Sequence, residues 1–238
     1  MSTSNTSPRI PRTTAVIFDL DGTLVDSEPN CFEAGRQLLA RHGITDFTWQ
    51  DHERYIGIST AETLALWRHE YGLTAPLEEL LADKNNRYLE LARTATRAYP
   101  QMYAFVELLH ADGVPMAVAS GSSRAAIEAI LKGTGLDTLL PTIVSAEEVA
   151  RGKPEPDIFL EAARRLGVDP ADCVVLEDAA PGVVAAHGAG MRCVAIPYVA
   201  ASADDAEFAT AELLFKGGQA EFTARAAYDW LTRPVTGV

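Results

Sequence analysis

Four short polar clusters in this sequence carry the residue types from which a catalytic site could be built. They are Asp19 with Asp21, the Ser-Gly-Ser turn at 120–122, Lys153 before Pro154, and Glu177 with Asp178. Carboxylates can attack, exchange protons or bind a hard cation, while hydroxyl and ammonium groups can hold an anion. Each cluster alone is typical of a turn or a helix cap. Their recurrence after successive apolar runs favours a shared site.

The apolar runs predict the strands that must position these clusters. Short runs bounded by turn residues cover 14–18, 114–119, 142–144, 173–176 and 193–196, with 212–215 as a sixth candidate. Between most of them, apolar residues at three-and-four spacing predict helices over 103–110, 124–132, 158–166 and 182–189. This alternation predicts an α/β fold, a Rossmann-like parallel sheet with helices on both faces. Ligands of such sheets bind beyond the carboxyl ends of the strands, where the four clusters would meet.

One interval breaks the alternation of strands and helices. Far more residues than a crossover needs separate the first strand from residue 114, and most read as helical, over 28–42, 60–71 and 76–97. We therefore expect an inserted α-helical cap over 27–96, a catalytic core over 14–26 and 97–238, and a disordered tail over 1–13. The cap would leave and re-enter beside the end of the first strand, where it can close over a ligand.

Composition and charge exclude several classes of partner. The formal net charge of -13 would repel nucleic acid and anionic membranes, so we expect neither as a partner. It would also repel a phosphorylated substrate, unless a metal ion and one or two cationic side chains concentrate positive charge locally. The sequence does not determine the oligomeric state, and a monomer is compatible with it.

The termini and cysteines suggest an ordinary intracellular globular protein. No run approaches the roughly 20 apolar residues of a membrane helix, and the polar start has no hydrophobic segment to direct secretion. We therefore expect a cytoplasmic protein. Cys31, Cys173 and Cys193 are widely spaced and form no C-x-x-C pair, which indicates neither a disulfide framework nor a zinc site.

The run 19–28, Asp-Leu-Asp-Gly-Thr-Leu-Val-Asp-Ser-Glu, resembles the first motif of the haloacid dehalogenase-like hydrolase superfamily. Ser120, Lys153-Pro154 and Glu177-Asp178 follow in the family's order, and the resemblance covers essentially everything after residue 13. The helical insert resembles that of the subgroup whose cap follows the first motif, which includes sugar-phosphate phosphatases, phosphoglycolate phosphatases and β-phosphoglucomutases. The resemblance implies a Mg²⁺-dependent phosphatase that hydrolyses a small phosphorylated metabolite, above all a sugar phosphate, through an aspartyl-phosphate.

The resemblance also implies roles for the first motif. Asp19 would be the nucleophile, and Asp21 would be the general acid for the leaving oxygen and then the base for water. In an extended chain, side chains two residues apart point to the same side, which suits this pair. Gly22 would permit the sharp turn that follows, and Thr23 would hydrogen-bond across it.

The other clusters would hold the metal ion and the phosphoryl group. The side chains of Asp19 and Asp178 and the backbone carbonyl of Asp21 would bind Mg²⁺. Glu177 would either hold a metal-bound water or have a structural role. The phosphoryl oxygens would be bound by side chains or backbone amides of four residues, Ser120, Gly121, Ser122 and Lys153.

The cap should select the substrate. The segment 55–59 resembles the cap loop that faces the active site in relatives, which makes Ile56 and Gly57 candidate substrate contacts. Three nearby cations could meet a second anionic group of the substrate: Arg54, Lys84 and Arg87. The competing interpretation is that they are solvated helix faces, as most charged residues are.

Two other functions compete with phosphate hydrolysis. The first is a β-phosphoglucomutase-like phosphosugar mutase, but Cys31 stands where the mutases resembling this chain carry a histidine. The second is a non-enzymatic phospho-aspartate receiver module, which also combines acidic residues, a hydroxyl and Lys-Pro at the ends of a parallel sheet. The order of the clusters, the length of the chain and the large cap all disfavour a receiver.

Overall fold

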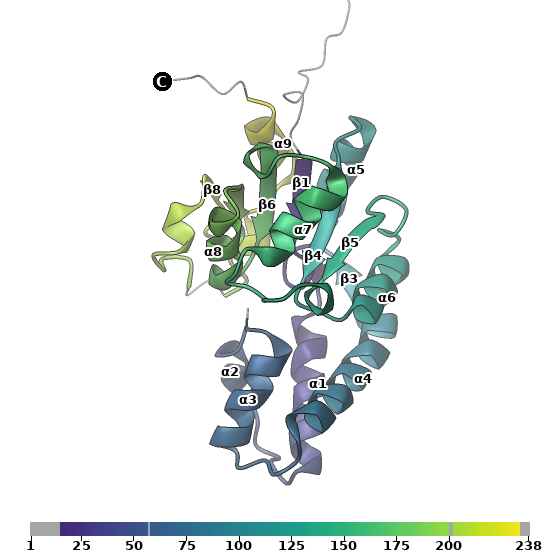
Figure 1. Cartoon of the computed structure of the whole chain (residues 1–238), viewed down its shortest axis with the longest axis vertical. Helices are drawn as coiled ribbons and strands as arrows, with labels where there is room; N and C mark the ends of the chain where they lie inside the picture. Colours follow the sequence, from purple (N-terminus) through teal and green to yellow (C-terminus); the bar gives the residue numbers. More distant parts are fainter. Residues whose placement is uncertain (1–14, 57, 200–201, 234–238) are drawn as a thin grey trace, which may run out of the picture.

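The computed structural model describes residues 15–56, 58–199 and 202–233, so the predicted tail over 1–13 lies outside the described residues. Within them the main sheet has six strands in the order β5-β4-β1-β6-β7-β8, and every neighbouring pair is parallel. The strands are β1 (Ala15–Phe18), β4 (Met116–Ser120), β5 (Thr142–Ser145), β6 (Cys173–Glu177), β7 (Arg192–Ala195) and β8 (Leu213–Leu214). The predicted fold class and its strands are confirmed, with small shifts at the strand ends (Figure 1).

The central strand β1 sets the register that assembles the polar clusters. Phe18 pairs with Val118 of β4 on one side and with Leu176 of β6 on the other, so the carboxyl ends of the three strands lie level. The amide of Asp19 extends this pairing by donating to the carbonyl of Leu176 at 3.0 Å. The polar residues that follow these strands therefore meet at one edge of the sheet.

Helices cover both faces of the sheet. One face packs against α5 (Pro100–Ala111), α6 (Arg124–Thr134) and α9 (Ala224–Leu231), and the other against α7 (Asp157–Leu166) and α8 (Ala180–Gly188). Along β1, Val16 and Phe18 face the first group, while Ala15 and Ile17 face the second. Burial on both sides explains why these strands are almost entirely apolar. The four helices predicted between the strands are confirmed, and α9 was not predicted.

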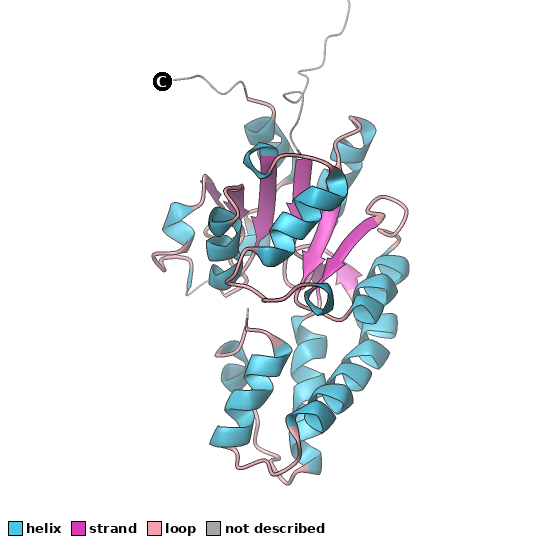
Figure 2. Cartoon of the chain, in the orientation of Figure 1, coloured by secondary structure: helices cyan, strands magenta, loops and turns pink. Residues whose placement is uncertain are grey.

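The residues of the predicted cap form a separate helical layer at one end of the strands, and Figure 2 shows this layer below the sheet. Its helices are α1 (Glu28–Arg41), α2 (Trp49–Glu53), α3 (Thr60–Glu70) and α4 (Leu77–Ala95). They enclose an apolar cluster of their own, in which Leu38, Leu64 and Trp67 are fully buried. The short helix α2 was not predicted, although Thr48 and Asp51 form a capping box at its start.

The two connections between sheet and helical layer run side by side. Strand β2 (Val25–Asp26) pairs antiparallel with β3 (Arg97–Ala98), and Asp26 lies opposite Arg97. This pair falls where the sequence suggested domain boundaries, after 26 and before 97. The division into a core and a cap stays a prediction, since α4 also packs against α6.

Short 3-10 turns lie at Ala146–Glu148, Pro170–Asp172, Phe208–Thr210 and Gly218–Ala220. None of the helices in the described part of the chain combines the length and the apolar character needed to cross a membrane. The three cysteines are free thiols, as the sequence indicated.

Candidate active site

Asp19 follows directly after β1 and is almost fully buried, with 6% of its surface exposed. The Nζ atom of Lys153 donates a hydrogen bond to its Oδ1 atom at 2.6 Å. Burial of the charged form raises the pKa of Asp19 to about 8, helped by the charges of Glu177 and Asp21 and opposed by Lys153. Asp19 is thus a carboxylate whose charge depends on nearby cations.

Lys153 bridges two carboxylates, because its Nζ atom also donates to Oε1 of Glu177. Its side chain is 12% exposed and its ammonium lies over the ring of Phe159. Burial alone would lower the pKa of Lys153, but the charges of Asp19 and Glu177 outweigh it and raise the pKa above its ordinary value. Lys153 is therefore a permanent cation at the end of β1.

Glu177, the last residue of β6, is held from both sides. While Oε1 faces Lys153, Oε2 accepts hydrogen bonds from the backbone amides of Asp178 at 3.0 Å and Ala179 at 3.1 Å. A Cβ atom placed at Gly182, in the first turn of α8, would collide with this carboxylate. The glycine therefore provides the space that Glu177 occupies, and Glu177 orients the backbone that carries Asp178.

Asp178 lies against the loop that follows β1. Its Oδ1 atom accepts a hydrogen bond from the hydroxyl of Thr23 at 3.2 Å, across 155 positions of sequence. The prediction that Thr23 bonds across its own turn is therefore wrong, because the side chain reaches the neighbouring strand end. Gly22 is required here twice over, since its φ is +84° and a Cβ atom on it would collide with Asp178.

The carboxylates of Asp19, Glu177 and Asp178 form a compact oxygen cluster. One ligand atom from each lies within 4.8 Å of the others. Burial, and then the charges of Asp19 and Glu177, raise the pKa of Asp178 well above its ordinary value. An all-oxygen set of this kind fits a hard divalent cation such as Mg²⁺. The identity of the ion and its ligands stay predictions.

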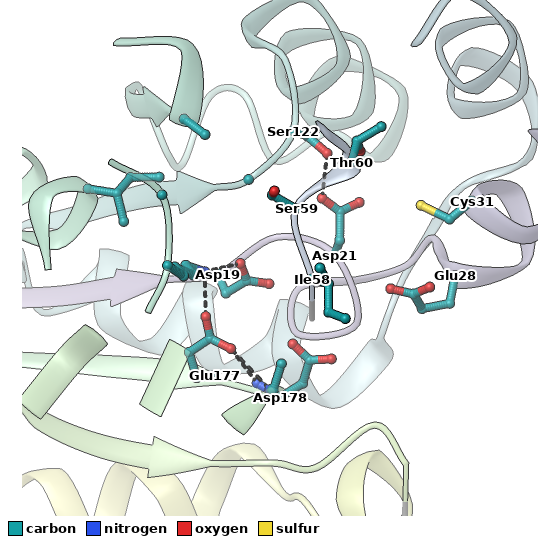
Figure 3. A pocket seen from close by; sticks show the side chains of 16 residues that line it. Asp19, Asp21, Glu28, Cys31, Ile58, Ser59, Thr60, Ser122, Glu177 and Asp178 are labelled. Carbon is teal, nitrogen blue, oxygen red and sulfur yellow. Dashed lines mark hydrogen bonds and ion pairs between the residues drawn. The ribbon is translucent and has the colours of Figure 1, made fainter. Parts of the chain in front are cut away.

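Asp21 accepts hydrogen bonds from four hydroxyl groups. Ser27 (2.6 Å) and Tyr88 donate to Oδ1, while Ser120 (3.1 Å) and Ser122 (2.7 Å) donate to Oδ2. The backbone amide of Ser122 in turn donates to the Ser120 hydroxyl at 3.0 Å. The predicted phosphate-binding turn therefore lies directly beside the predicted acid and base, as Figure 3 shows for Ser122.

A cavity of about 120 Å³ lies between the sheet edge and the helical layer, and its lining includes Asp19, Asp21, Ser122, Lys153, Glu177 and Asp178. Figure 3 shows Asp19, Asp21, Glu177 and Asp178 together with Ile58, Ser59 and Thr60 of the predicted cap, which all line this cavity. A second cavity of about 260 Å³ adjoins it. The two share lining residues from both parts of the molecule: Cys31, Ser59, Thr60, Gly121, Ser122, Ala146 and Gly152.

Of the cap residues that the sequence singled out, some line the two cavities and others do not. Arg54 pairs with Glu70 at 3.1 Å and Arg87 with Asp83 at 3.0 Å, and neither is among the described residues that line the two cavities. Ile56 is half-buried and likewise absent from the described lining, while Gly57 lies outside the described residues. Among the predicted cations, Lys84 does line the second cavity.

Sequence reasoning missed several contacts in and around the site. Glu28 lines the first cavity and pairs with the buried His52 at 2.8 Å. Tyr88 contacts Asp21, and Nε2 of Gln219 donates to the carbonyl of Thr23 at 2.9 Å. Glu28 belongs to the first motif and could have been found there. The other three carry no local signal, because their partners are distant in sequence.

Comparison with known proteins shows similarity to one family of hydrolases. The family described as haloacid dehalogenase-like hydrolase matches residues 13–190, which include all four polar clusters. The chain is 36% identical over 203 residues to the bifunctional riboflavin kinase/FMN phosphatase of Arabidopsis thaliana. That match covers 83% of this chain and 51% of the relative, so the chain spans about half the length of that protein.

Two further similarities extend over nearly the whole of the compared protein. The chain is 36% identical over 195 residues to fructose-1-phosphate phosphatase YqaB of Escherichia coli, covering 77% of this chain and 96% of the relative. The solved structure of CbbY from Rhodobacter sphaeroides in complex with phosphate matches with a TM-score of 0.76 at 28% identity. That match covers 88% of this chain and 96% of CbbY.

Proposed function

The chain belongs to the haloacid dehalogenase-like hydrolases and is a phosphatase, and we propose that it hydrolyses a sugar phosphate or a similarly small metabolite through a phosphorylated Asp19 with Mg²⁺. One observation carries the proposal. The Asp19 carboxylate lines the first cavity and receives a 2.6 Å hydrogen bond from Lys153, with two further buried carboxylates adjacent. The predicted enzyme class is confirmed, so the receiver alternative is not retained.

The attack would start from Asp19. Lys153 occupies Oδ1, so Oδ2 is the atom proposed to form the bond to phosphorus while the bond from phosphorus to the leaving oxygen breaks. Lys153 is fixed in place by Glu177 and stays cationic, so it can offset the charge on the phosphoryl oxygens without moving. Holding both groups in position removes much of the orientational cost of the reaction.

Proton transfer would fall to Asp21. In its acid form it gives a proton to the leaving oxygen, and as a carboxylate it then takes a proton from the water that attacks phosphorus and releases Asp19. The hydroxyls of Ser120 and Ser122 orient the Oδ2 side of this carboxyl, and those of Ser27 and Tyr88 the Oδ1 side. Asp21 is thus held by both the sheet edge and the helical layer.

The proposed Mg²⁺ ion would be held by the carboxylates of Asp19 and Asp178 and by the backbone carbonyl of Asp21. When bound, it supplies positive charge that counters the repulsion between the phosphate and these carboxylates. Glu177 is already engaged by Lys153 and two backbone amides, so its proposed role is to position the neighbours of the ion.

Hydrolysis is favoured over a mutase by the residue at position 31. Cys31 lines both cavities, and burial, with the charges of Glu28 and Asp21, raises the pKa of its thiol well above the ordinary value. A neutral thiol cannot take the place of an imidazole as a proton acceptor at neutral pH. The sugar-phosphate class is supported by the relative named fructose-1-phosphate phosphatase.

The test measures phosphate released from a panel of sugar phosphates with and without Mg²⁺. Asp19→Asn should abolish release, whereas Asp46→Asn, at an exposed position away from the site, should leave it unchanged. Full activity of Asp19→Asn would contradict the nucleophile assignment. Conversion of β-glucose 1-phosphate into glucose 6-phosphate without free phosphate would identify a mutase instead.

A further inference from the structure

Gln219 donates hydrogen bonds to the loop that follows the proposed acid and base. This glutamine lies in the short 3-10 turn Gly218–Ala220, and its Nε2 atom donates to the carbonyls of Thr23 at 2.9 Å and Gly22 at 3.3 Å. The family match ends at residue 190. Gln219 therefore lies outside the matched part of the chain, and the match assigns it no role.

The two carbonyls belong to a buried turn over 20–25. Two backbone amides of this turn donate to the carbonyl of Leu20, at 3.0 and 3.1 Å. Gly22 and Thr23 are both buried, and among the described residues only Gln219 donates to their carbonyls. A buried carbonyl without a partner is costly. Gln219 thus supplies hydrogen bonds that the turn does not make for itself.

The other polar atom of this side chain gains nothing from its position. Oε1 of Gln219 is buried and accepts no hydrogen bond from the described residues. An unpaired buried acceptor is unfavourable, and an apolar side chain of the same length would avoid this cost. What glutamine adds at position 219 is therefore its pair of donated hydrogen bonds.

The segment that carries Gln219 is anchored in the core. The amide of Phe215 donates to the carbonyl of Ala195, at the end of β7, at 2.9 Å. The rings of Phe215 and Phe222 are buried and pack edge to face, with their centroids 5.1 Å apart. Gln219, which lies between these two residues in the chain, can therefore hold the turn in a fixed position.

The turn reaches two groups of the proposed mechanism. Asp21 directly precedes Gly22, and the hydroxyl of Thr23 donates to Oδ1 of Asp178 at 3.2 Å. We infer that Gln219 is a positioning residue, which fixes this turn and through it the orientation of Asp21 and the placement of Asp178. The inference rests on the proposed function, which assigns Asp21 to proton transfer and Asp178 to the metal ion.

Gln219→Met tests the inference, because it removes both donors and keeps an unbranched side chain of similar length. We expect kcat for phosphate release to fall roughly 10-fold with KM within about twofold, since the turn positions reacting groups. The matched control is Gln101→Met, which removes a glutamine that accepts the backbone amide of Ala224 at 3.1 Å. Its kcat should stay within about twofold of the wild type.

Hydrogen exchange in the metal-free protein measures the turn without any catalysis. Peptides that cover residues 20–25 should exchange roughly 10-fold faster in Gln219→Met, and at the wild-type rate in Gln101→Met.

The Mg²⁺ requirement tests the connection to Asp178. Gln219→Met should raise the Mg²⁺ concentration for half-maximal activity, but it should cause no further rise when combined with Thr23→Val. That second variant already lacks the hydroxyl through which the turn contacts Asp178. An additive rise in the double variant would overturn the placement of Asp178 through this turn.

Three outcomes would overturn the inference as a whole. They are an unchanged kcat in Gln219→Met, a turn that exchanges at the wild-type rate in that variant, and an equal loss of kcat in Gln101→Met. If the wild type releases no phosphate from the sugar phosphates, the proposed function fails separately. Hydrogen exchange then decides on Gln219 alone: faster exchange confined to Gln219→Met supports its hold on the turn, and unchanged exchange overturns it.

Discussion

The hydroxyl of Tyr88 in helix α4 donates a hydrogen bond to Oδ1 of Asp21, the residue two positions beyond the proposed nucleophile. Tyr88 is 7% exposed, and burial, together with the charge of Asp21, raises its pKa well above the ordinary value. The phenol therefore stays protonated at neutral pH and can act as a donor. A residue of the predicted cap thus helps to orient the proposed acid and base of the core.

Replacing Tyr88 with Phe removes this donor and little volume. We expect kcat to fall roughly 10-fold, as for a lost hydrogen bond to a charged group, with a smaller change in KM. The control is Tyr103→Phe, because the described residues provide no hydrogen bond to that hydroxyl. Steady-state kinetics with Mg²⁺ checks both variants, and an unchanged kcat in Tyr88→Phe would show that Ser27 alone orients Oδ1.

Gly182→Ala, in the first turn of α8, should disrupt the site by displacing the Glu177 carboxylate. The added Cβ atom would collide with the Glu177 carboxylate and force it away from Lys153 and the amides of Asp178 and Ala179. We expect a loss of roughly 1–3 kcal/mol in the free energy of unfolding, together with most of the activity.

Gly188→Ala in the same helix is the matched control for Gly182→Ala. Its Cβ atom would lie 3.6 Å from Pro156, an ordinary contact. Alanine is the better helix former, so this variant should be as stable as the wild type or more so. Urea denaturation of the two variants checks the pair. Equal stability of both variants would mean that Glu177 is not held where the structure shows it.

Chelation of divalent cations should abolish phosphate release, and added Mg²⁺ should restore it. Thr23→Val removes the hydroxyl that donates to Oδ1 of Asp178 while keeping the volume of the fully buried side chain. We expect the Mg²⁺ concentration for half-maximal activity to rise roughly 10-fold, since partners that orient a metal ligand matter to this degree. Thr134→Val, which loses only bonds within its own helix, should titrate like the wild type.

The protein should lose stability in acid through Glu161 of α7. This carboxylate accepts hydrogen bonds from Arg164 and Arg165, which lower its pKa from the ordinary 4.5 to about 2. A pKa that is lower in the folded state gives stability that is fully present above about pH 4.5 and is lost as the pH falls towards 2.

Glu161→Gln should therefore cost about 1 kcal/mol at pH 7, after allowance for solvent screening of the partly exposed pair. At pH 3 the difference from the wild type should shrink to less than half of that. Glu90→Gln, at an exposed position on α4, should cost little at either pH. Urea denaturation at the two pH values is the measurement, and a cost that does not change with pH would contradict the pairing.

The main sheet could be predicted because its signal is local. Apolar runs that end in Asp19, Ser120 and Glu177 specify strands, and parallel pairing then brings the strand ends together. The helix α9 and the ribbon of β2 and β3 were missed for physical reasons. The amphipathic run of α9 is short, and β2 and β3 have only two residues each, so tertiary contacts define them.

The side-chain partners within the site could not be predicted in the same way. Arg54, Lys84 and Arg87 look alike in the sequence, and only the fold shows that Glu70 and Asp83 neutralise the two arginines. The same holds for Thr23, whose partner Asp178 lies on another strand end. Types of residue at strand ends are readable from a sequence, whereas the pairing of charges across elements depends on packing.

The order of strands in the sheet has a consequence for biosynthesis. Strand β1 is the first to leave the ribosome, yet it lies between β4 and β6, and Ile17 pairs with Val175. The apolar run Ala15–Phe18 therefore keeps at least one unpaired edge until β6 has been made. Such an edge is an aggregation hazard for a nascent chain. Release of a chain truncated before residue 173 should leave this edge open, with Asp19 present but neither Glu177 nor Asp178 beside it.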